Sequence, residues 1–531
     1  MSTPAPMHKV AALADLEDAR PRRVELHDTP ILLIRSGTTV HALGANCPHA
    51  GAPLEQGAVC HGHLICPWHN GTFEIASGAL VEPPPLQPLP RYPVKIERGD
   101  VLVGLTPEAP STPALTRDNR ADLRDDASPA TARVFAIVGA GAAGAAACAA
   151  LREFGCRERI VLIDAEPQTP YDRTSLSKFV PSGEMQAADV PPLLPDAFFD
   201  EQRIERLHAR VTRLDAERRE IEFDAHPPLR YDAALVATGG VPKMPPLDGA
   251  DDPAVKPRLL LLRNRADAER VAGFAEPGKR AVVLGSSFIG LEIASSLAKR
   301  KVQVTVVSPQ RVPFEKQMGA ELGRVFMRLH EAHGTTFRMN TQIEGVAKGA
   351  PLDVRVSGGD TLACDFVVIG TGVTPATGFI RGVARNDDGS LDVDASMRAA
   401  EHLYAAGDLA RFPFGDNRRV RIEHWRVAQQ HARAAARAML GLPAQAAAPP
   451  FFWTYHFDRT FSYLGHPQQW DETAILGELD AWRFIALLCK HGYVAGVLGC
   501  GRDADIGRLA EAMREPLSRA DAERLIERGA C

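Results

Sequence analysis

Two short segments near the start of the chain combine thiol and imidazole side chains that can hold iron. Cys47-Pro-His49 and Cys66-Pro-Trp-His69 each carry one cysteine and one histidine, and sixteen residues separate them. Zinc fingers usually pair Cys with Cys and His with His. Mixed pairs fit a [2Fe–2S] cluster in which two cysteines hold one iron and two histidines hold the other. We therefore predict Cys47, His49, Cys66 and His69 as cluster ligands; a zinc knuckle or scattered surface residues are the alternatives.

Residues 41–82 resemble a Rieske ferredoxin domain on these two segments. Many Rieske proteins of membrane complexes carry an extra cysteine in each loop, where this sequence has Ala52 and Trp68. The resemblance is thus to soluble Rieske ferredoxins, and it implies a reduction potential in the lower part of the range of about −150 to +300 mV. Cys60 lies between the loops, fits no ligand position and is interpreted as structural.

A glycine-rich turn follows the β-like run Val134–Val138. Gly139-Ala-Gly141-Ala-Ala-Gly144 opens an Ala-rich helix, and such glycines let the backbone approach a pyrophosphate at a helix N-terminus. Asp164 and Glu166 follow the next strand at about the spacing that suits a ribose hydroxyl. One of them is expected to bind the ribose, and the alternative is that both are ordinary solvated carboxylates.

The same region mimics a membrane span. Val134–Leu151 carries no charge over 18 residues, which is about the lower limit for a spanning helix. It consists mostly of Ala and Gly, so a strand, a turn and a helix explain it better, and we predict no membrane span.

A second turn, Gly285-Ser-Ser-Phe-Ile-Gly290, opens another strand–helix–strand unit. Ser287 replaces the middle glycine of the fingerprint and leaves less room for the backbone to approach a phosphate. Ser308 follows the second strand, so no carboxylate is present there for a ribose 2′-hydroxyl, while Arg311 is available for a 2′-phosphate. The choice between NADH and NADPH therefore stays open.

Two such units in one chain resemble the flavoprotein reductases that bind two dinucleotides. Three further segments match motifs of that family: Leu235-Val-Ala-Thr-Gly239, Val368-Ile-Gly370-Thr-Gly372 and Tyr404-Ala-Ala-Gly407-Asp408. The resemblance implies FAD in the first unit, with Asp408 on the ribityl chain, and NAD(P)H in the second. Residues from about 450 onwards are similar to the reductase C-terminal domain.

Pro170-Tyr-Asp-Arg173-Thr-Ser-Leu-Ser-Lys178 narrows the resemblance to the branch of apoptosis-inducing-factor-like proteins and oxygenase-coupled ferredoxin reductases. It implies that Arg173 and Lys178 contact the flavin, that Lys178 pairs with Glu292, and that Trp425 lies near the ring. The alternatives are surface charges for Lys178 and Glu292 and core packing for Trp425.

The predicted site residues form three further sets. The predicted catalytic residues are Lys178 and Glu292. The predicted FAD-binding residues are Gly139, Gly141, Ala143, Gly144, Asp164, Glu166, Arg173, Lys178, Val211, Lys243, Gly407, Asp408 and Trp425. Among them, Ala143, Val211 and Lys243 are implied by the family resemblance alone. The predicted NAD(P)-binding residues are Gly285, Gly290, Glu292, Ser308 and Gly372.

The remaining cysteines match no functional position. No cysteine lies between Tyr171 and Val211, so the C-x₄-C redox pair of disulfide reductases is absent. We expect burial for the six others, which are Cys148, Cys156, Cys364, Cys489, Cys500 and Cys531. Nine cysteines in so long a chain do not make a disulfide scaffold, and no secretory signal is recognised, so we expect several cysteines to stay reduced and a cytoplasmic location.

The length and the charge of the chain limit its domain organisation and its possible partners. The chain has 531 residues with 61 basic and 66 acidic groups, which suggests several domains and gives no reason to expect nucleic acid as a partner. The predicted fold is multidomain: an all-β Rieske domain, two α/β dinucleotide-binding domains of the Rossmann type, and a small α+β C-terminal domain. The expected boundaries are 7–105 for the Rieske domain, 106–131 for a linker, 132–250 and 367–446 for the FAD domain, 251–366 for the NAD(P) domain, and 447–531 for the C-terminal domain.

These features predict an NAD(P)H-dependent oxidoreductase that passes electrons through FAD to the [2Fe–2S] cluster. The final acceptor is unknown, with a ferredoxin, a cytochrome or an oxygenase as candidates, and the oligomeric state, a homodimer included, stays open. The alternatives are a slowly turning over redox sensor resembling apoptosis-inducing factor and the reductase component of a separate oxygenase system. The predicted linker also suggests a Rieske domain that docks and undocks.

Overall fold

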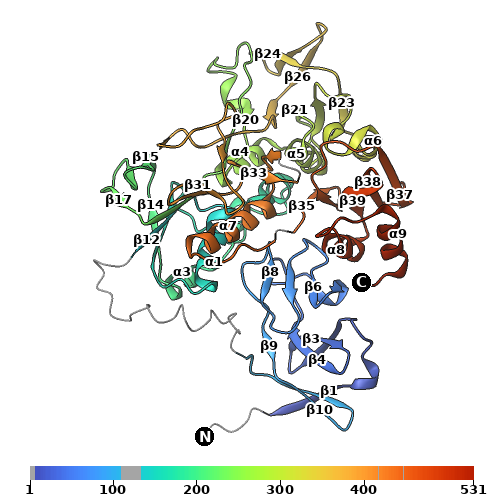
Figure 1. Ribbon diagram of the computed structural model, residues 1–531. Helices are drawn as coiled ribbons and strands as arrows, with labels where there is room; N and C mark the ends of the chain where they lie inside the picture. The colour runs from blue at the N-terminus through green and yellow to red at the C-terminus, as the bar shows by residue number, and fades with distance from the viewer. Residues whose placement is uncertain (1–5, 109–132, 416–417, 447) are drawn as a thin grey trace.

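The computed structural model describes residues 6–108, 133–415, 418–446 and 448–531, which form four parts (Figure 1). The first is the N-terminal domain, built from three antiparallel sheets with the strand orders β1-β11-β10, β2-β3-β4-β9 and β5-β6-β7-β8. Its strands are β1 (Met7–Ala12), β2 (Arg22–Leu26), β3 (Thr29–Ser36), β4 (Thr39–Gly44), β5 (Ala58–Cys60), β6 (His63–Ile65), β7 (Thr72–Glu74), β8 (Leu80–Glu82), β9 (Arg91–Tyr92), β10 (Val94–Glu97) and β11 (Asp100–Gly104). The loops β4–β5 and β6–β7 carry the predicted cluster ligands.

The first α/β domain contains a six-stranded sheet of order β14-β13-β12-β18-β32-β31, in which only β31 runs antiparallel. Its strands are β12 (Val134–Val138), β13 (Arg159–Asp164), β14 (Ile204–His208), β18 (Ala233–Val236), β31 (Arg398–Ala400) and β32 (Leu403–Ala405). Helices α1 (Ala142–Glu153) and α7 (Trp425–Met439) pack against each other. Alanine side chains line this contact and let the two helices approach closely. The uncharged stretch from Val134 is thus a strand followed by a helix, as predicted.

The second α/β domain is built on an all-parallel sheet of order β20-β27-β21-β22-β23. Its strands are β20 (Leu259–Leu260), β21 (Arg280–Leu284), β22 (Gln303–Val307), β23 (Thr336–Arg338) and β27 (Phe366–Ile369), and its helices are α4 (Arg265–Phe274), α5 (Phe288–Lys299) and α6 (Glu315–Ala332). β27 pairs with β21, so the domain boundary expected after residue 366 falls inside this strand. The chain leaves the sheet only after Ile369.

The C-terminal domain is a five-stranded antiparallel sheet of order β35-β36-β39-β38-β37 with two helices. Its elements are β35 (Phe451–His456), β36 (Arg459–Gly465), β37 (Glu472–Glu478), β38 (Arg483–Lys490), β39 (Tyr493–Cys500), α8 (Asp503–Ala512) and α9 (Arg519–Arg528). Residues of β35 and β36 share one hydrophobic core with α5 and α6. The C-terminal domain is therefore packed on the second α/β domain.

Smaller elements complete the described chain. They are α2 (Phe179–Ser182), α3 (Asp196–Glu201), β15 (Val211–Asp215), β16 (Glu220–Phe223), β17 (Leu229–Arg230), β19 (Gly240–Pro242), β24 (Ile343–Ala347), β25 (Leu352–Val356), β26 (Thr361–Cys364), β28 (Val373–Pro375), β29 (Ile380–Arg381), β30 (Leu391–Asp392), β33 (Ala410–Phe414) and β34 (Arg418–Val420). Most of the expected linker, 106–131, lies outside the described residues. Among the residues that are described, no helix is both long and apolar enough to cross a membrane.

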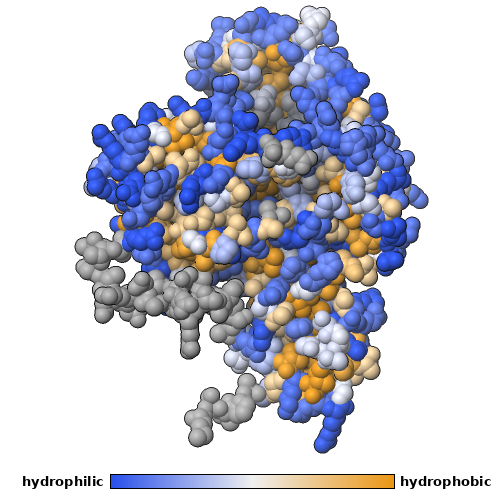
Figure 2. Space-filling view, viewed as in Figure 1, coloured by the Kyte–Doolittle hydropathy of each residue, from blue (hydrophilic) through white to orange (hydrophobic). Residues whose placement is uncertain are grey.

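The N-terminal domain is docked on α7 and α8 (Figure 1). α7 presents its alanines to α1, and its long polar side chains reach backbone carbonyls of the N-terminal domain on the other side. Arg426 Nε donates to the carbonyl O of Pro83 at 2.7 Å, and Arg433 Nη2 donates to that of Leu80 at 3.2 Å. On the face shown in Figure 2, hydrophilic residues cover much of the second α/β domain, and more hydrophobic ones gather on the N-terminal domain.

Candidate functional site

The four predicted cluster ligands meet at the tip of the N-terminal domain. Cys47 and Cys66 are buried, and the interaction with the Cys66 thiol, together with burial, raises the pKa of Cys47. The Nδ1 atoms of His49 and His69 lie 3.0 Å apart, close to the roughly 3.4 Å expected for two nitrogens on one tetrahedral metal ion. Within the described ranges, no three His, Cys, Asp or Glu side chains gather around one point. The donors are arranged as a sulfur pair and a nitrogen pair, which suits two irons.

The surroundings of these ligands fit a cluster. The backbone N–H groups of His49 and Ala50 point at the Cys47 sulfur, and those of Trp68 and His69 point at the Cys66 sulfur. Such hydrogen bonds stabilise thiolates and tune a cluster's potential. Burial lowers the pKa of His69 well below its ordinary value, and the charges of His49 and Lys178 lower it further. The neutral imidazole is the form that binds a metal ion.

The first glycine turn has the conformation that a dinucleotide requires. Gly139 has φ +104°, and a Cβ there would meet the backbone of Ala237. A Cβ at Gly144 would collide with the carbonyl O of Gly139, so the third glycine permits the close turn. Around Gly141, by contrast, there is open space. The helix N-terminus is therefore accessible to a phosphate.

Two adjoining cavities follow this turn. One of about 250 Å³ is lined by Ala143, Lys178, Glu292, Asp408 and Trp425 among others. The other, of about 500 Å³, is lined by Gly139, Asp164, Glu166 and Val211 among others. They share Gly141, Arg173, Ala237 and Arg263 as walls, so together they form an elongated site that suits a dinucleotide.

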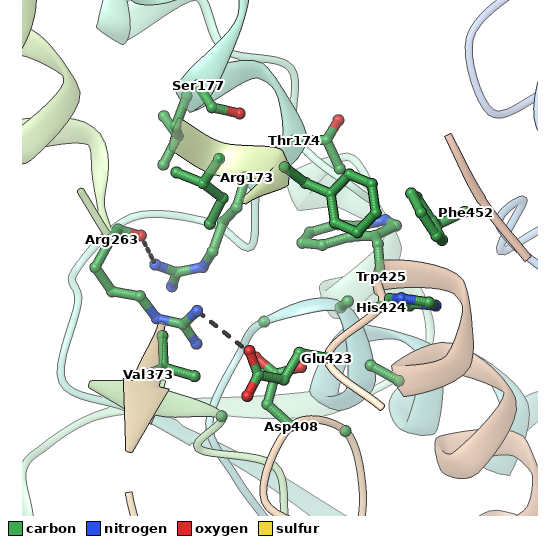
Figure 3. Close-up of a pocket in the computed structure, with 18 of the residues that line it drawn as sticks. Arg173, Thr174, Ser177, Arg263, Val373, Asp408, Glu423, His424, Trp425 and Phe452 are labelled. Atoms are coloured by element: carbon green, nitrogen blue, oxygen red, sulfur yellow. Dashed lines mark hydrogen bonds and ion pairs between the residues drawn. The ribbon is translucent and has the colours of Figure 1, made fainter. Parts of the chain in front are cut away.

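Polar atoms at this site lack partners within the described protein. The indole Nε1 of Trp425 and Nδ1 of His424 are buried without a hydrogen bond. Figure 3 shows both side chains at the cavity, opposite Arg173 and Arg263. Because buried polar groups are normally hydrogen-bonded, this arrangement fits a bound polar cofactor. Burial also raises the pKa of Glu423, and nearby Asp408 adds to the rise, while Arg421 and Lys243 oppose it.

The two carboxylates predicted at the ribose have different partners. Asp164 Oδ2 accepts from the backbone N–H of Ala140 at 2.8 Å and so holds the glycine turn. Glu166 accepts from Arg173 Nη2 at 2.6 Å and from the hydroxyl of Tyr171 at 2.7 Å. Both line the same cavity, and Glu166 ties Arg173 to the site.

Lys178 and Glu292 form a buried ion pair in the wall of the smaller cavity. Lys178 Nζ lies 3.1 Å from Glu292 Oε2 and donates to the carbonyl O of Thr174 at 2.9 Å. Their side chains are only 6% and 5% exposed, which excludes the alternative that they are surface charges. Ser177 donates a further hydrogen bond to Glu292.

A chain of buried groups continues from Glu292 into the C-terminal domain. The hydroxyl of Thr454 donates to Glu292 Oε1 at 2.7 Å, and His456 Nε2 lies 2.9 Å from the same hydroxyl. His456 Nδ1 in turn lies 3.3 Å from His330 Nε2. All three residues are almost completely buried. Sequence reasoning missed this chain because no motif marks it.

The second glycine turn repeats the first with one difference. Gly285 has φ +106°, and a Cβ at Gly290 would collide with the carbonyl O of Gly285. The Ser287 hydroxyl donates to the carbonyl O of Gly370 at 3.1 Å, so it is turned towards the neighbouring loop. Ser308 is buried and hydrogen-bonded to Ser286. Arg311, the candidate for a 2′-phosphate, forms an ion pair with Glu315.

Other predicted residues are placed as follows. Gly407 and Asp408 line the smaller cavity, and Arg263 Nη1 lies 3.8 Å from Asp408 Oδ2 (Figure 3). Gly372 has φ +91° with open space at its Cβ position. Lys243 is exposed and acts on the site through its charge near Glu423. No sequence motif marks Arg263, and the same is true of the hydrogen-bonded residues Thr454, His456 and His330.

Trp453 lies between the two predicted redox sites. Its indole contacts the His69 imidazole, with ring centroids 4.1 Å apart, and it also lines the cavity beside Lys178 and Glu292. A third cavity of about 410 Å³ lies beside this contact, and residues of both sites line it, among them His49, His69, Lys178 and Trp453. The two sites therefore share one wall.

The cysteine prediction needs one correction. Cys148, Cys156, Cys364, Cys489 and Cys500 are buried free thiols, as expected. Cys531, however, is exposed and forms a disulfide with Cys60. The expectation of burial for Cys531 was wrong, because the fold brings the chain after α9 to the end of β5, which the sequence does not reveal.

Comparison with known proteins agrees with this geometry. Residues 134–432 match the family described as pyridine nucleotide-disulphide oxidoreductase, and residues 7–93 match the Rieske [2Fe–2S] domain. Apoptosis-inducing factor 3 of Mus musculus is 33% identical over 526 residues, which cover 98% of this chain and 85% of that protein. The ferredoxin reductase subunit of the 5,5′-dehydrodivanillate O-demethylase of Sphingobium is 29% identical over 398 residues, covering 74% and 95%.

A solved structure shows the same fold. The ferredoxin reductase for the CYP199A2 system of Rhodopseudomonas palustris superposes with a TM-score of 0.69 at 26% identity, covering 75% of this chain and all of that one. The matches thus cover the N-terminal domain and the two α/β domains that hold the glycine turns. The chain belongs to the pyridine nucleotide-disulphide oxidoreductase family, as a ferredoxin-reductase-like, FAD-dependent oxidoreductase that carries an N-terminal Rieske [2Fe–2S] domain.

Proposed function

We propose that electrons pass within one molecule from NAD(P)H through FAD to the cluster held by Cys47, His49, Cys66 and His69. The observation that carries this proposal is the position of Trp453, which touches His69 on one side and lines the candidate flavin cavity on the other. The docked domains thus need no rearrangement for the electron to reach the cluster.

The side chains of the site bind, orient and balance charge. When bound, FAD accepts a hydride and releases electrons singly, and a [2Fe–2S] cluster carries one electron. The helix N-terminus after Gly141 would hold the pyrophosphate, Arg173 would hold the cofactor at the junction of the two cavities, and Asp408 would hold it in the smaller one. Lys178 favours negative charge at the ring, and Glu292 keeps that lysine in place. The proposal needs no nucleophile and no general base.

The nicotinamide nucleotide is assigned to the turn Gly285–Gly290 and to Gly372. The buried Ser308 offers no carboxylate for a 2′-hydroxyl, and Arg311 is engaged by Glu315. Steady-state kcat/KM values for NADH and NADPH, compared in wild type and Arg311→Ala, decide between the two nucleotides. A preference for NADPH that the variant loses assigns Arg311 to the 2′-phosphate.

For the final acceptor we propose a one-electron protein such as a ferredoxin, a cytochrome or an oxygenase component. Two relatives named as ferredoxin reductases of a demethylase and of a CYP199A2 system support this choice. The five buried free thiols other than the two cluster ligands support a cytoplasmic location. Sustained NAD(P)H-dependent reduction of a ferredoxin or of cytochrome c distinguishes this function from a slow redox sensor, which would be reduced without turnover.

Stopped-flow spectroscopy of the holoenzyme tests the electron path. We compare wild type, His69→Ala, and His61→Ala as a control, since His61 is an exposed histidine between the ligand loops. NADH should reduce the flavin equally fast in all three, and only His69→Ala should lose the electron paramagnetic resonance signal of the cluster and the reduction of the acceptor. Acceptor reduction at the wild-type rate in His69→Ala would place the cluster off the path.

A further inference from the structure

A disulfide joins the N-terminal domain to the C-terminal domain. Cys60 is the last residue of β5 in the N-terminal domain, and Cys531 follows α9 of the C-terminal domain by three residues. Their Cα atoms lie 5.2 Å apart, inside the usual range of about 4.4–6.8 Å. Figure 1 shows the C-terminus beside β6 and α8. The bond therefore crosses the contact between the two domains.

The rest of this contact is noncovalent. α8 packs on β5, and Gly507 lies so close that a Cβ there would meet Ile65 at 3.2 Å. His63 Nδ1 lies 3.1 Å from Glu511 Oε1, and Arg514 joins Glu511 to Glu82 with contacts of 2.8 and 3.4 Å. These polar contacts can break and reform, whereas the disulfide holds the domains together for as long as it is oxidised.

The two cysteines of the disulfide differ in their exposure to solvent. Cys60 is 1% exposed, whereas Cys531 and the four residues before it are exposed. Of the other seven cysteines, Cys47 and Cys66 are the predicted cluster ligands and the remaining five are buried free thiols. A small thiol or a thiol protein can therefore approach the Cys531 side of the bond, and Cys60 is the sulfur that is released into the interior.

We propose that Cys60 and Cys531 form a redox-controlled latch that a dithiol reductant opens. A thiolate of the reductant attacks the Cys531 sulfur, which forms a mixed disulfide and releases Cys60 as a thiolate that takes up a proton. The second thiol of the reductant then displaces Cys531. Two electrons and two protons pass from the dithiol to the pair, and the reductant leaves as its own disulfide.

The latch controls how long the N-terminal domain stays docked. With the bond closed, a covalent link fixes the N-terminal domain at β5, and an intramolecular contact of this kind has a high effective concentration. With the bond open, residues 529–531 are free and only noncovalent contacts remain. Opening the latch should speed the delivery of electrons from the exposed cluster to a protein acceptor, and this consequence rests on the proposed function. The latch itself does not depend on the proposed function.

Peptide mapping tests the bond. The holoenzyme is purified without thiols, alkylated with N-ethylmaleimide and digested with trypsin, which leaves Cys60 in the peptide 36–91 and Cys531 in the peptide 529–531. Wild type should yield these two peptides linked, and dithiothreitol should separate them. Cys60→Ser should abolish the linked species. Its absence from the oxidised wild-type enzyme would overturn the proposal.

Hydrogen exchange tests the effect on docking. Amides of residues 58–65 and 505–511 should exchange on the order of tenfold faster in wild type treated with dithiothreitol than in untreated wild type. Cys531→Ser should show the fast rate in both conditions. Cys156→Ser, a free cysteine remote from this contact, should respond like wild type. Equal exchange in oxidised and reduced wild type would show that the bond is no latch, whatever the electron-transfer activity.

Discussion

The indole ring of Trp453 lies against the imidazole of His69, with their centroids 4.1 Å apart and their planes inclined by 43°. Trp453 and Tyr455 alternate along β35 with Thr454 and His456, and successive side chains of a strand point to opposite faces. One face of β35 thus borders the cluster ligands, and the other completes the hydrogen bonds of Glu292. A single strand of the C-terminal domain contacts both candidate redox sites.

Trp453→Leu should slow electron transfer from flavin to cluster. The substitution removes the ring that fills the space between His69 and the flavin cavity, and small displacements of reacting groups change rates by up to about 100-fold. Stopped-flow absorbance should show flavin reduction by NADH unchanged and cluster reduction delayed. Trp482→Leu, in the same domain but away from both sites, is the control. An unchanged cluster rate in Trp453→Leu would exclude this side chain from the path.

Lys178→Met and Glu292→Gln should each destabilise the protein by about 3–5 kcal/mol, because each leaves an unpaired buried charge. The double variant should be more stable than the sum of the two changes predicts. Denaturant unfolding of the three proteins gives the coupling free energy. Additive effects would mean that the two charges do not depend on each other, despite their separation of 3.1 Å.

Thr454→Val should destabilise the protein by about 1–3 kcal/mol, because it leaves Glu292 Oε1 without its donor inside the protein. Thr454→Ser keeps the hydroxyl and should recover most of the loss. Unfolding free energies of both variants, together with the absorption spectrum of bound FAD, check this. If serine proved as harmful as valine, the methyl group of Thr454 and its packing would be responsible.

The residues that sequence reasoning found differ in kind from those it missed. Cys47, His49, Cys66 and His69, and both glycine turns, are local patterns whose spacing is set by one loop or one strand–helix junction. Trp453, Thr454 and the Cys60–Cys531 bond instead depend on how separate domains pack, and no local spacing encodes that. Lys178 and Glu292 are 114 positions apart and were paired only through the family resemblance.

Docking was expected, but the surface on which the N-terminal domain docks was not predicted. The sequence suggested a domain on a flexible linker, but it gave no sign that Arg426, Gln429 and Arg433 project from one face of α7 to carbonyls of the N-terminal domain. Arginines at such spacing usually indicate a solvated helix face. The helix sequence alone does not reveal that another domain supplies carbonyl acceptors for them.

Stability should fall as the pH is lowered below about 6.5. Burial lowers the pKa of His456 to about 3 and that of His431 to about 4, so between these values and 6.5 the unfolded chain binds protons that the folded protein does not. Each histidine then contributes up to about 1.4 kcal/mol of lost stability per pH unit. Unfolding free energies measured at pH 7.5, 6.0 and 5.0 should show a shallower slope for His456→Gln than for wild type. An identical slope would mean that His456 is protonated in the folded state.

Arg426→Met should loosen the docking of the N-terminal domain without unfolding it. The guanidinium is buried, donates to the carbonyl O of Pro83 at 2.7 Å and to that of Asn70 at 3.3 Å, and lies 3.6 Å from Glu82. Methionine keeps much of the apolar stem but leaves the carbonyl O of Pro83 without this donor, at about 1–3 kcal/mol. The carbonyl O of Asn70 still accepts from the Thr72 hydroxyl at 3.1 Å. Faster hydrogen exchange in residues 80–84, with unchanged exchange in the sheet of the first α/β domain, is the expected result. Arg437→Met is the matched control, because Arg437 lies on the same helix but donates to Pro443 instead. Equal protection of residues 80–84 in both variants would show that Arg426 does not hold the N-terminal domain in place.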